Sequence, residues 1–354
     1  MHDERTNLYG LDAEGLRAAL ADFGLEAYKI RQIYAALYRR DVLEPRAWTD
    51  LSKTLRAALE QRFRFERPTI SQRTIARDGT IKMLLDLPRG GRVEAVAIPA
   101  EDRLTFCISS QIGCSFGCSF CMTARLGLMR HLDCGEIVGQ VAALVEDRAA
   151  ERGRYNIVFM GMGEPLSNLT AVLRAIRLLT DEQAFGLGPR RITVSTVGLP
   201  KGIAKLAEEK NVPRLAVSLV AADQKVRETL MPIARNVDLN ALGDAVRAFG
   251  EGRRDRPTLE VVLLDGINDH PHLAAKLAAY ARKVRAKVNL IEFNPTSELP
   301  FEPSPESRMN HFLSVLGRAG VIGTVRRSRG KDASAACGQL AFSGRNRNGG
   351  VPKT

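Results

Sequence analysis

The stretch that decides the fold runs from Cys107 to Cys121 and reads CISSQIGCSFGCSFC. Three of its cysteines, Cys114, Cys118 and Cys121, have the spacing CxxxCxxC, with small or aromatic residues between them. Thiolates at such short spacings hold iron–sulfur clusters. A common cluster of four irons takes four ligands and the loop offers three, so we expect one iron to stay open to a small molecule.

Other uses of these cysteines fit the sequence less well. A structural zinc site often has two CxxC pairs, and the sequence contains neither a second pair nor an HxxxH pair. Disulfide frameworks are typical of short secreted chains, whereas the N-terminus MHDERTNLYG is polar and lacks a secretory signal pattern. The spacing is similar to that of radical S-adenosylmethionine (SAM) enzymes, whose open iron is chelated by the amino and carboxylate groups of SAM.

Composition limits the remaining choices. The chain has 354 residues, of which 45% are hydrophobic, enough for a sizeable core with one or two domains. No apolar run reaches the length of a membrane span, so we expect no membrane contact and a cytoplasmic protein with reduced cysteines. Lys and Arg number 52 against 40 Asp and Glu, a net charge of +12 that suits a polyanionic partner such as RNA.

Residues 1–66 are expected to form a small helical domain. Three helices are predicted, at about 12–23, 26–40 and 50–63, with Asp12 capping the first and Gly24 ending it. The polar face of the second helix carries basic side chains, namely Lys29, Arg31, Arg39 and Arg40. The domain is either a packing unit with solvated charges or a module that contacts RNA.

Residues 67–100 change to strand periodicity. TISQRTIA and TIKMLLDL flank Asp78-Gly79, which predicts a hairpin, and Arg89-Gly90-Gly91 turns into the strand VEAVAIP. A short β-meander is therefore expected to lead into the cysteine loop. A carboxylate in such a strand usually faces solvent, so the pattern places Glu94 on the outside.

Residues 101–345 alternate strands with helices. Strands are predicted at 104–108, 156–161, 192–197, 214–221, 258–264 and 287–294, with helical stretches between them and one more helix after 304. Repeats of this kind form parallel sheets with right-handed crossovers, so we expect an α/β fold, a partial (β/α)6 barrel. Residues 346–354 are expected to be a disordered tail.

Polar motifs follow the ends of these strands, where barrels of this type place their active sites. The segment Gly161 to Pro165 reads GMGEP and follows the second strand; its glycines permit close backbone approach, and its carboxylate suits the amino group of SAM. Outside the triplet, Cys337 lies among basic residues that favour a reactive thiolate. Cys134 is expected to be a small buried hydrophobe.

Together these strings resemble the radical SAM RNA methyltransferases that modify carbon 2 of an adenosine in large-subunit (23S) ribosomal RNA. The matching strings span nearly the whole chain and include FMGMGEPL and NLIEFNP; the cysteine loop and RGKDASAACGQL together are highly specific. The resemblance implies one 4Fe–4S cluster per chain, with Cys114, Cys118 and Cys121 as its ligands. It also implies SAM contacts at Gly163, Glu164, Ser195, Ser218, Val220 and Asn294.

The resemblance further implies a mechanism with two SAM molecules. One methylates Cys337, and the other is cleaved to a 5′-deoxyadenosyl radical that takes a hydrogen atom from the new methyl group. The carbon radical then adds to adenine, Glu94 accepts the ring proton, and Cys107 releases the product through a transient disulfide with Cys337. The family usually reads SLHA where this chain has Val220, which leaves only the backbone of position 220 to contact SAM.

Three alternatives stay open at this point. The same cysteines serve relatives that methylate carbon 8 of adenosine. A radical SAM enzyme for a small molecule or protein needs the triplet and GMGEP but has no reason to hold both Cys107 and Cys337. An iron–sulfur protein without enzymatic activity needs none of the SAM contacts. The resemblance to the carbon-2 methyltransferases implies RNA as the partner, and close relatives also act on transfer RNA. It further implies an electron donor such as flavodoxin or ferredoxin, and a monomeric enzyme.

Overall fold

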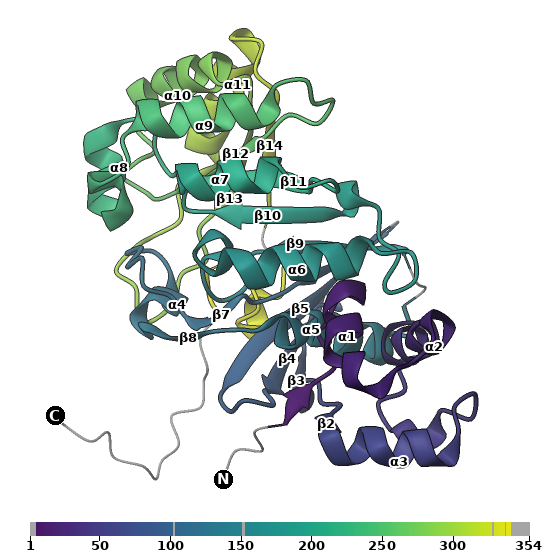
Figure 1. Cartoon of the computed structure of the whole chain (residues 1–354). Coiled ribbons are helices and arrows are strands. Elements are labelled where there is room, and N and C mark those ends of the chain that lie inside the picture. The colour runs from purple at the N-terminus through teal and green to yellow at the C-terminus, as the bar shows by residue number, and fades with distance from the viewer. Residues whose placement is uncertain (1–4, 102, 151–152, 328, 337, 341–354) are drawn as a thin grey trace, which may run out of the picture.

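In a computed structural model of the chain, residues 5–340 are described except for 102, 151–152, 328 and 337. The expected tail at 346–354 lies outside the described residues. Within them, the main sheet has ten strands in the order β14-β13-β12-β11-β10-β9-β6-β5-β4-β3 (Figure 1). This order places the antiparallel meander and the parallel barrel strands side by side in one continuous sheet.

The parallel part of the sheet confirms the expected α/β barrel. Its strands are β6 (Arg103–Cys107), β9 (Tyr155–Phe159), β10 (Ile192–Thr196), β11 (Arg214–Ser218), β12 (Thr258–Leu263), β13 (Lys287–Glu292) and β14 (Gly323–Arg326). The sequence predicted all of these except β14. That strand reads GTVR and has one large apolar residue, so its own pattern carries no strand signal.

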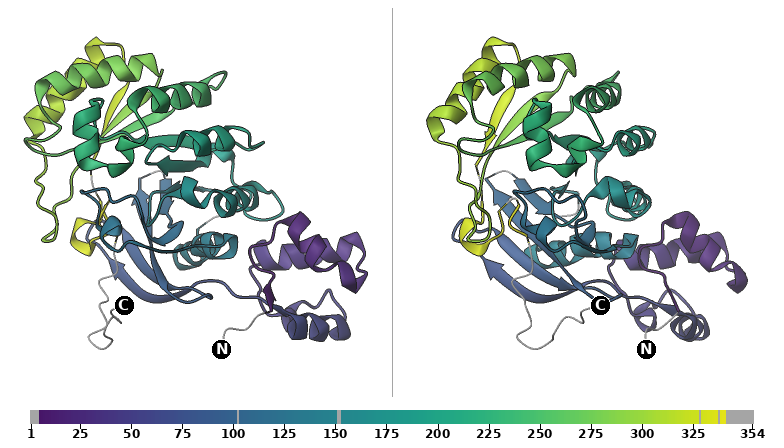
Figure 2. Two further views of the ribbon diagram at one scale, coloured as in Figure 1. Left: turned by 60° about the vertical axis from the view of Figure 1, so that its left-hand side comes forward. Right: turned by 90° about the vertical axis from the view of Figure 1, so that its left-hand side faces the viewer.

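Helices cover the outer face of the parallel strands, as Figure 2 shows. They are α5 (Cys134–Arg148), α6 (Leu169–Thr180), α7 (Pro200–Ala207), α9 (Leu239–Gly250), α10 (Pro271–Lys283) and α11 (Glu306–Arg318). In α6 the fully buried residues Val172, Ala175, Ile176 and Leu179 recur at helical spacing and form the face that packs on the sheet. Two short helices were not predicted, α4 (Met122–Arg125) and α8 (Gln224–Leu230).

The meander consists of β3 (Thr69–Ile75), β4 (Ile81–Asp86) and β5 (Arg92–Ala100). Its first turn is the predicted one: Gly79 has a φ of 79°, and the Asp78 carboxylate accepts a hydrogen bond from the Thr80 N–H at 3.0 Å. β5 pairs antiparallel with β6, which joins the meander to the barrel.

The predicted exposure of Glu94 is wrong. Residues 93–97 of β5 are all buried, and Glu94 is only 3% exposed. Both faces of this strand are covered, because the C-terminal segment lies over the inner face, where Lys82 donates a hydrogen bond to the Ser334 carbonyl at 3.2 Å. That cover comes from residues more than two hundred positions away, and an alternating local pattern cannot reveal it.

The N-terminal elements are β1 (Thr6–Asn7), α1 (Ala13–Ala19), α2 (Ala27–Tyr38), α3 (Lys53–Arg62) and β2 (Phe63–Arg64). Asp12 caps α1 as the sequence predicted, but α1 ends at Ala19, earlier than expected, and the left-handed Gly24 instead ends a short 3-10 turn over Ala21–Phe23. The third helix starts later than expected, because the Ser52 side chain accepts a hydrogen bond from the Leu55 N–H and caps it there.

These helices pack directly against the barrel. The Tyr34 hydroxyl donates to Asp181 at 2.7 Å, the ring centroids of Tyr38 and Phe185 are 6.2 Å apart, and buried apolar residues form one core through both parts. Figure 1 shows α1 lying against α5. In the described part of the chain no helix is long and apolar enough to cross a membrane.

The contact between the N-terminal segment and α5 depends on a glycine. A Cβ on Gly135 would lie 2.6 Å from the Tyr9 carbonyl oxygen, a backbone atom that cannot move alone. We expect Gly135→Ala to lower the free energy of unfolding by about 1–3 kcal/mol, because the helix and the segment must separate. Gly317→Ala in α11 is the matched control: no atom lies within 4 Å of its Cβ position, so stability should rise by up to about 1 kcal/mol. Equal stabilities of the two variants in denaturant titrations would contradict this account.

Candidate active site

The cysteine loop is closed at its base by a short antiparallel ladder. β7 (Gln111–Gly113) pairs with β8 (Leu128–His131), and the Cys114 N–H donates to the Gly127 carbonyl at 3.0 Å. Gly113 has a φ of 75°, and a Cβ there would lie 1.7 Å from the same carbonyl oxygen. Only glycine lets the two ends of the loop approach this closely.

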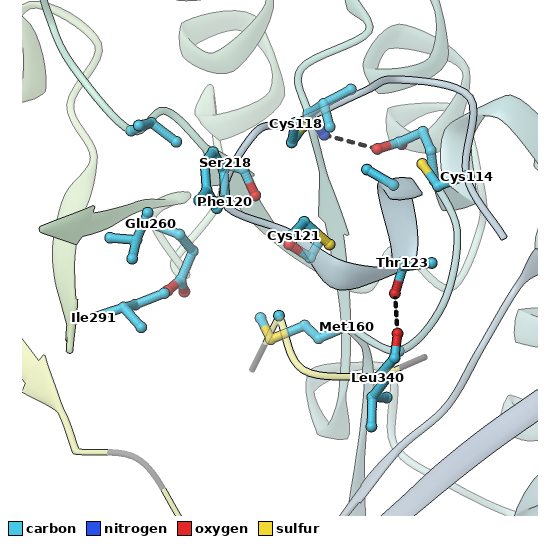
Figure 3. Close-up of a pocket in the computed structure, with 18 of the residues that line it drawn as sticks. Cys114, Cys118, Phe120, Cys121, Thr123, Met160, Ser218, Glu260, Ile291 and Leu340 are labelled. Carbon is cyan, nitrogen blue, oxygen red and sulfur yellow. Dashed lines mark hydrogen bonds between the residues drawn. The ribbon is translucent and has the colours of Figure 1, made fainter. Parts of the chain in front are cut away.

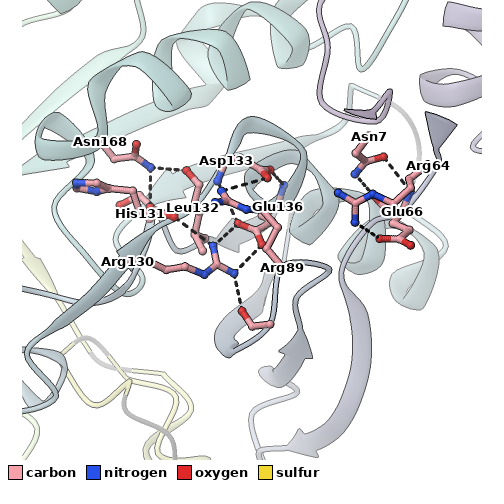
Figure 4. A network of polar contacts seen from close by, with 12 residues as sticks. Asn7, Arg64, Glu66, Arg89, Arg130, His131, Leu132, Asp133, Glu136 and Asn168 are labelled. Carbon is pink, nitrogen blue, oxygen red and sulfur yellow. Dashed lines mark hydrogen bonds and ion pairs between the residues drawn. The ribbon is translucent and has the colours of Figure 1, made fainter. Parts of the chain in front are cut away.

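A network of polar contacts holds the segment after the loop (Figure 4). Arg130 donates both terminal nitrogens to the buried Glu136 carboxylate, each at 2.7 Å, and Asp133 and Glu136 form a capping box at the start of α5. The Asn168 amide bridges the carbonyls of Ser110 and Leu132. The loop is therefore fixed from both sides before any ligand binds.

One pocket contains all the residues that the sequence assigned to the cluster and to SAM. Its lining includes the three cysteines and, from the strand ends, Gly163, Glu164, Ser195, Ser218, Val220 and Asn294. Figure 3 shows the cysteines of the loop facing Ser218, Glu260 and Met160 across the pocket. Residues from five segments far apart in sequence thus meet at the carboxyl ends of the parallel strands.

Glu164 is the best-fixed acidic group in the pocket. Its carboxylate accepts hydrogen bonds from the Leu166 N–H at 2.9 Å and the Val197 N–H at 2.8 Å, and its own N–H donates to the Gln111 side chain at 2.7 Å. Burial raises the pKa of the Glu164 carboxyl to about 7, although these hydrogen bonds oppose the shift. A ligand ammonium group would restore the charged form.

The glycines of GMGEP are required by protein packing. A Cβ on Gly161 would lie 2.6 Å from the Ile108 carbonyl, and a Cβ on Gly163 would lie 2.5 Å from the Gln111 side chain. Gly163 also has a φ of 99°. These two residues therefore let the GMGEP loop seat directly on the strand that leads into the cysteines.

The donor set fits an iron–sulfur cluster better than a single metal ion. Among the described residues, no group of three His, Cys, Asp or Glu side chains is arranged to hold one ion, whereas a cluster takes its thiolates on separate irons. Burial raises the pKa of the Cys114 thiol to about 11 and that of Cys118 still further. Both are therefore protonated without metal, and cluster binding must release their protons.

Val220 has a strained backbone. It is a β-branched residue with a φ of 64°, a conformation that costs about 1–3 kcal/mol. Its carbonyl accepts a hydrogen bond from the Asn268 amide at 2.9 Å, and its N–H points to the Glu260 carbonyl at 3.3 Å. The surrounding residues thus fix the backbone of position 220 at the pocket wall.

Glu94 and Cys107 lie beside this pocket rather than in it. Val96 of β5 is directly opposite both Lys82 of β4 and Cys107 of β6, so all three face the inside of the barrel, and Glu94 is two positions from Val96 on the same face. Lys82 and Glu94 form a buried ion pair with a distance of 3.0 Å. Cys107 lines a second cavity that shares Met160, Ile291 and Leu340 with the first.

Cys337 itself lies outside the described residues. On its C-terminal side, the Gly338 carbonyl accepts from the Met122 N–H at 2.9 Å, and the Leu340 carbonyl accepts from the Thr123 hydroxyl at 2.6 Å (Figure 3). Met122 and Thr123 directly follow Cys121. These bonds fasten the C-terminal segment next to the cysteine loop.

Sequence reasoning missed three charged residues around the site. Glu260 lines the first pocket, where burial raises the pKa of its carboxyl and the Asn289 amide donates to it at 2.9 Å. Lys82 pairs with Glu94, and Arg227 of α8 is fully buried behind the loop. The signal for Glu260 and Lys82 was a charged residue inside an otherwise apolar strand; Arg227 gave none, because a basic residue in a short helix is usually exposed.

Known proteins resemble this chain over almost its whole length. Residues 108–278 match the Radical SAM superfamily, and residues 6–64 match the ribosomal RNA large subunit methyltransferase N-terminal domain. A probable dual-specificity RNA methyltransferase RlmN from Cytophaga hutchinsonii is 42% identical over 94% of this chain and 92% of its own. The dual-specificity RNA methyltransferase RlmN of Solidesulfovibrio magneticus is 40% identical, covering 95% and 96%.

A solved structure shares the fold. The crystal structure of a radical SAM methyltransferase from Sphaerobacter thermophilus superposes with a TM-score of 0.89, at 43% identity, and covers 95% of this chain and 99% of that one. The expected fold is thereby confirmed for the N-terminal helices and the barrel together.

The raised pKa of Glu164 predicts a pH dependence of SAM binding. In the free protein the carboxyl is neutral below about pH 7, whereas the SAM amino group, which still donates N–H bonds when its lone pair is on iron, is accepted best by the carboxylate. Binding therefore releases the Glu164 proton below this pH, and the contribution of Glu164 to the affinity should fall up to about tenfold for each pH unit as pH drops, and level off above it. Equilibrium binding of SAM to anaerobically reconstituted protein, from about pH 6 to about pH 8, measures this.

Glu164→Gln is the control for that titration. The amide cannot titrate, so the variant should bind SAM more weakly at high pH and lose the step near pH 7 that the Glu164 carboxyl causes. A step of the same size in Glu164→Gln would assign the titration to another group.

Proposed function

This chain belongs to the RlmN family of radical SAM RNA methyltransferases, and we propose that it methylates carbon 2 of an adenosine in 23S ribosomal RNA. The enzyme works with a 4Fe–4S cluster and SAM on an RNA substrate. One observation carries the finer proposal: the triplet and the strand-end polar groups line one pocket, and Glu94 and Cys107 face the inside of the same barrel beside it. Transfer RNA is a second candidate substrate, because the names of the two RlmN relatives describe dual specificity.

We assign the cofactor contacts to the residues of the first pocket. Cys114, Cys118 and Cys121 hold the cluster, and Glu164 accepts from the amino group of SAM while remaining tethered to Val197. The remaining contacts are Gly163, Ser195, Ser218, Asn294 and the fixed backbone of Val220. When bound, the cluster and SAM supply a one-electron cleavage that yields methionine and a 5′-deoxyadenosyl radical.

Cys337 is the proposed methyl carrier. Carbon 2 of adenine is electron-poor, so it does not attack the methyl group of SAM, whereas a carbon radical can add to it. The Cys337 thiolate displaces S-adenosylhomocysteine from one SAM and gains the methyl group on sulfur. That methyl group loses a hydrogen atom to the 5′-deoxyadenosyl radical, which becomes 5′-deoxyadenosine, and the carbon radical left on Cys337 bonds to the base. The basic neighbours of Cys337 in sequence favour the thiolate that the first step requires.

Glu94 and Cys107 complete the reaction. The Glu94 carboxylate, which Lys82 orients from 3.0 Å, accepts the proton of carbon 2, and the unpaired electron of the adduct passes to the oxidised electron carrier, a flavodoxin or ferredoxin. A closed-shell thioether then joins Cys337 to the base. The Cys107 thiolate attacks the sulfur of Cys337, and a disulfide forms as the bond from sulfur to the transferred carbon breaks. The electron pair of that bond passes to the base, which takes up a proton and completes the methyl group. An external dithiol reductant must then reopen the disulfide.

RNA contact is proposed for the N-terminal helices. Arg31, Arg39 and Arg40 surround a shallow depression on the outer face of α2, next to the exposed Tyr28. Exposed basic and aromatic side chains of this kind bind phosphates and stacked bases. The proposal also includes a flavodoxin or ferredoxin as electron donor and a monomeric enzyme.

The two catalytic cysteines should fail in different ways when replaced. Cys337→Ala has no methyl carrier, so RNA stays unmodified and unattached. Cys107→Ala can form the bond to the base but cannot release it, so protein covalently joined to RNA should accumulate as a nuclease-sensitive band of higher mass. Cys134→Ala, in a buried position at the start of α5, is the control and should methylate normally. Normal turnover by Cys107→Ala would exclude the two-cysteine mechanism and favour a radical SAM reaction on another substrate.

The proposed role of the N-terminal helices predicts a specific change in salt dependence. Replacing Arg31 and Arg39 by Gln removes two exposed charges, and the slope of log affinity against log salt should fall by about 1 for each phosphate that is no longer neutralised. Filter binding of 23S ribosomal RNA fragments at several salt concentrations measures the slope. Arg282→Gln, an exposed residue on the distant α10, should leave it unchanged; equal effects at both places would show that net charge alone sets the affinity.

A further inference from the structure

Arg227 is a buried cation with no anionic partner in the described part of the chain. It lies in α8 and is 0% exposed, yet no Asp or Glu carboxylate there comes within ion-pair distance of it. Its terminal nitrogens donate to two backbone carbonyls, that of Val197 at 2.9 Å and that of Val237 at 3.2 Å. Its Nε has no hydrogen-bond partner. A buried charge without a counter-charge is strongly destabilising, which calls for an explanation.

The missing counter-charge lies in the direction of the cysteine loop. The cysteine loop is bonded to α8 between Cys118 and Cys121. There the Ser119 N–H donates to the Leu230 carbonyl at 3.0 Å, and Leu230 lies one helical turn after Arg227. Tyr280 and Cys118 are the titratable groups whose ionised forms would raise the pKa of the guanidinium, and Arg227 in turn lowers the pKa of the Cys118 thiol. Val197, which accepts from Arg227, lines the pocket itself.

We propose that Arg227 is the counter-charge of the iron–sulfur cluster and sets its reduction potential. The proposal rests on the assignment of Cys114, Cys118 and Cys121 as cluster ligands. Three thiolates outweigh the charge of an oxidised four-iron core, so the loaded site is anionic, and one-electron reduction adds a further negative charge. A fixed cation behind Cys118 stabilises the reduced state more than the oxidised state. It therefore makes the cluster easier to reduce, as the cleavage of SAM requires.

A purely structural role makes a different prediction. Arg227 also supports Val197, whose N–H positions the Glu164 carboxylate. If hydrogen bonding were its only task, any replacement that loses the guanidinium fork would act alike, and the effect would appear in SAM affinity. A charge effect instead appears in the potential of the cluster before SAM is added, and it separates replacements by their charge.

The test compares two variants that both lose the fork. Arg227→Lys keeps the positive charge and Arg227→Gln removes it; Arg235→Gln, an exposed arginine just after α8, removes a solvated charge nearby. Each protein is reconstituted with iron and sulfide without oxygen, and its midpoint potential is measured by a dye-mediated titration followed by electron paramagnetic resonance. No SAM or RNA is present.

We expect Arg227→Gln to shift the reduction equilibrium at least tenfold toward the oxidised state, about 59 mV more negative for a one-electron couple. Arg227→Lys should shift it much less, and Arg235→Gln should match the wild type because water and salt screen an exposed charge. If Arg227→Gln takes up no iron while Arg227→Lys loads fully, the need for a positive charge is also upheld.

Two results would overturn the inference. In one, loaded Arg227→Gln has the potential of the wild type. In the other, Lys and Gln behave alike, whether both shift or both fail to load, which would assign the role to the hydrogen bonds. Failure of the wild-type protein to take up iron would instead refute the cluster assignment on which the inference rests.

Discussion

The site exists because β6 and the strands β9 to β14 run parallel in one continuous ladder. A parallel register brings every carboxyl end to the same edge, and each strand delivers one polar group there: the loop after β6 carries thiols, that after β9 carries Glu164, and β10 and β11 carry Ser195 and Ser218. A single antiparallel strand within this ladder would send one group to the opposite edge. The polar groups of the pocket therefore meet because the strands run in one direction.

Two buried carboxylates near the site are each paired with a basic side chain. Glu94 is matched by Lys82, and Glu136 by Arg130, each at hydrogen-bonding distance. Glu164 and Arg227 are different, because neither has an oppositely charged partner among the described residues; Glu164 accepts from the N–H groups of Leu166 and Val197, and Arg227 donates to the carbonyls of Val197 and Val237. Buried groups left without a charged partner have perturbed pKa values and mark functional sites. A cationic ligand group would balance the charge of Glu164, and an anionic one would balance that of Arg227.

Much of the fold and of the candidate site could be predicted from the sequence, and the features that could not be predicted share a cause. The cysteine spacing, the strand–helix alternation and GMGEP are local patterns, and they correctly predicted the barrel and the edge that holds its pocket. The burial of Glu94 depends on the C-terminal segment, whose Ser334 carbonyl accepts from Lys82 over the meander, and β14 is defined by its pairing with β13 at the opposite edge of the sheet. Arg227 was missed because its burial depends on the loop that α8 supports. Contacts across such sequence distances leave no periodic signal.

The central claim is that the loop holds a four-iron cluster with one iron open to SAM, and electron paramagnetic resonance of the reduced, anaerobically reconstituted protein tests it most directly. The account predicts about four irons per chain and a signal that changes when SAM is added, because the open iron gains the amino and carboxylate ligands of SAM. Cys118→Ala should lose this signal, and Cys134→Ala should keep it. A full cluster in Cys118→Ala, or a wild-type signal indifferent to SAM, would contradict the account.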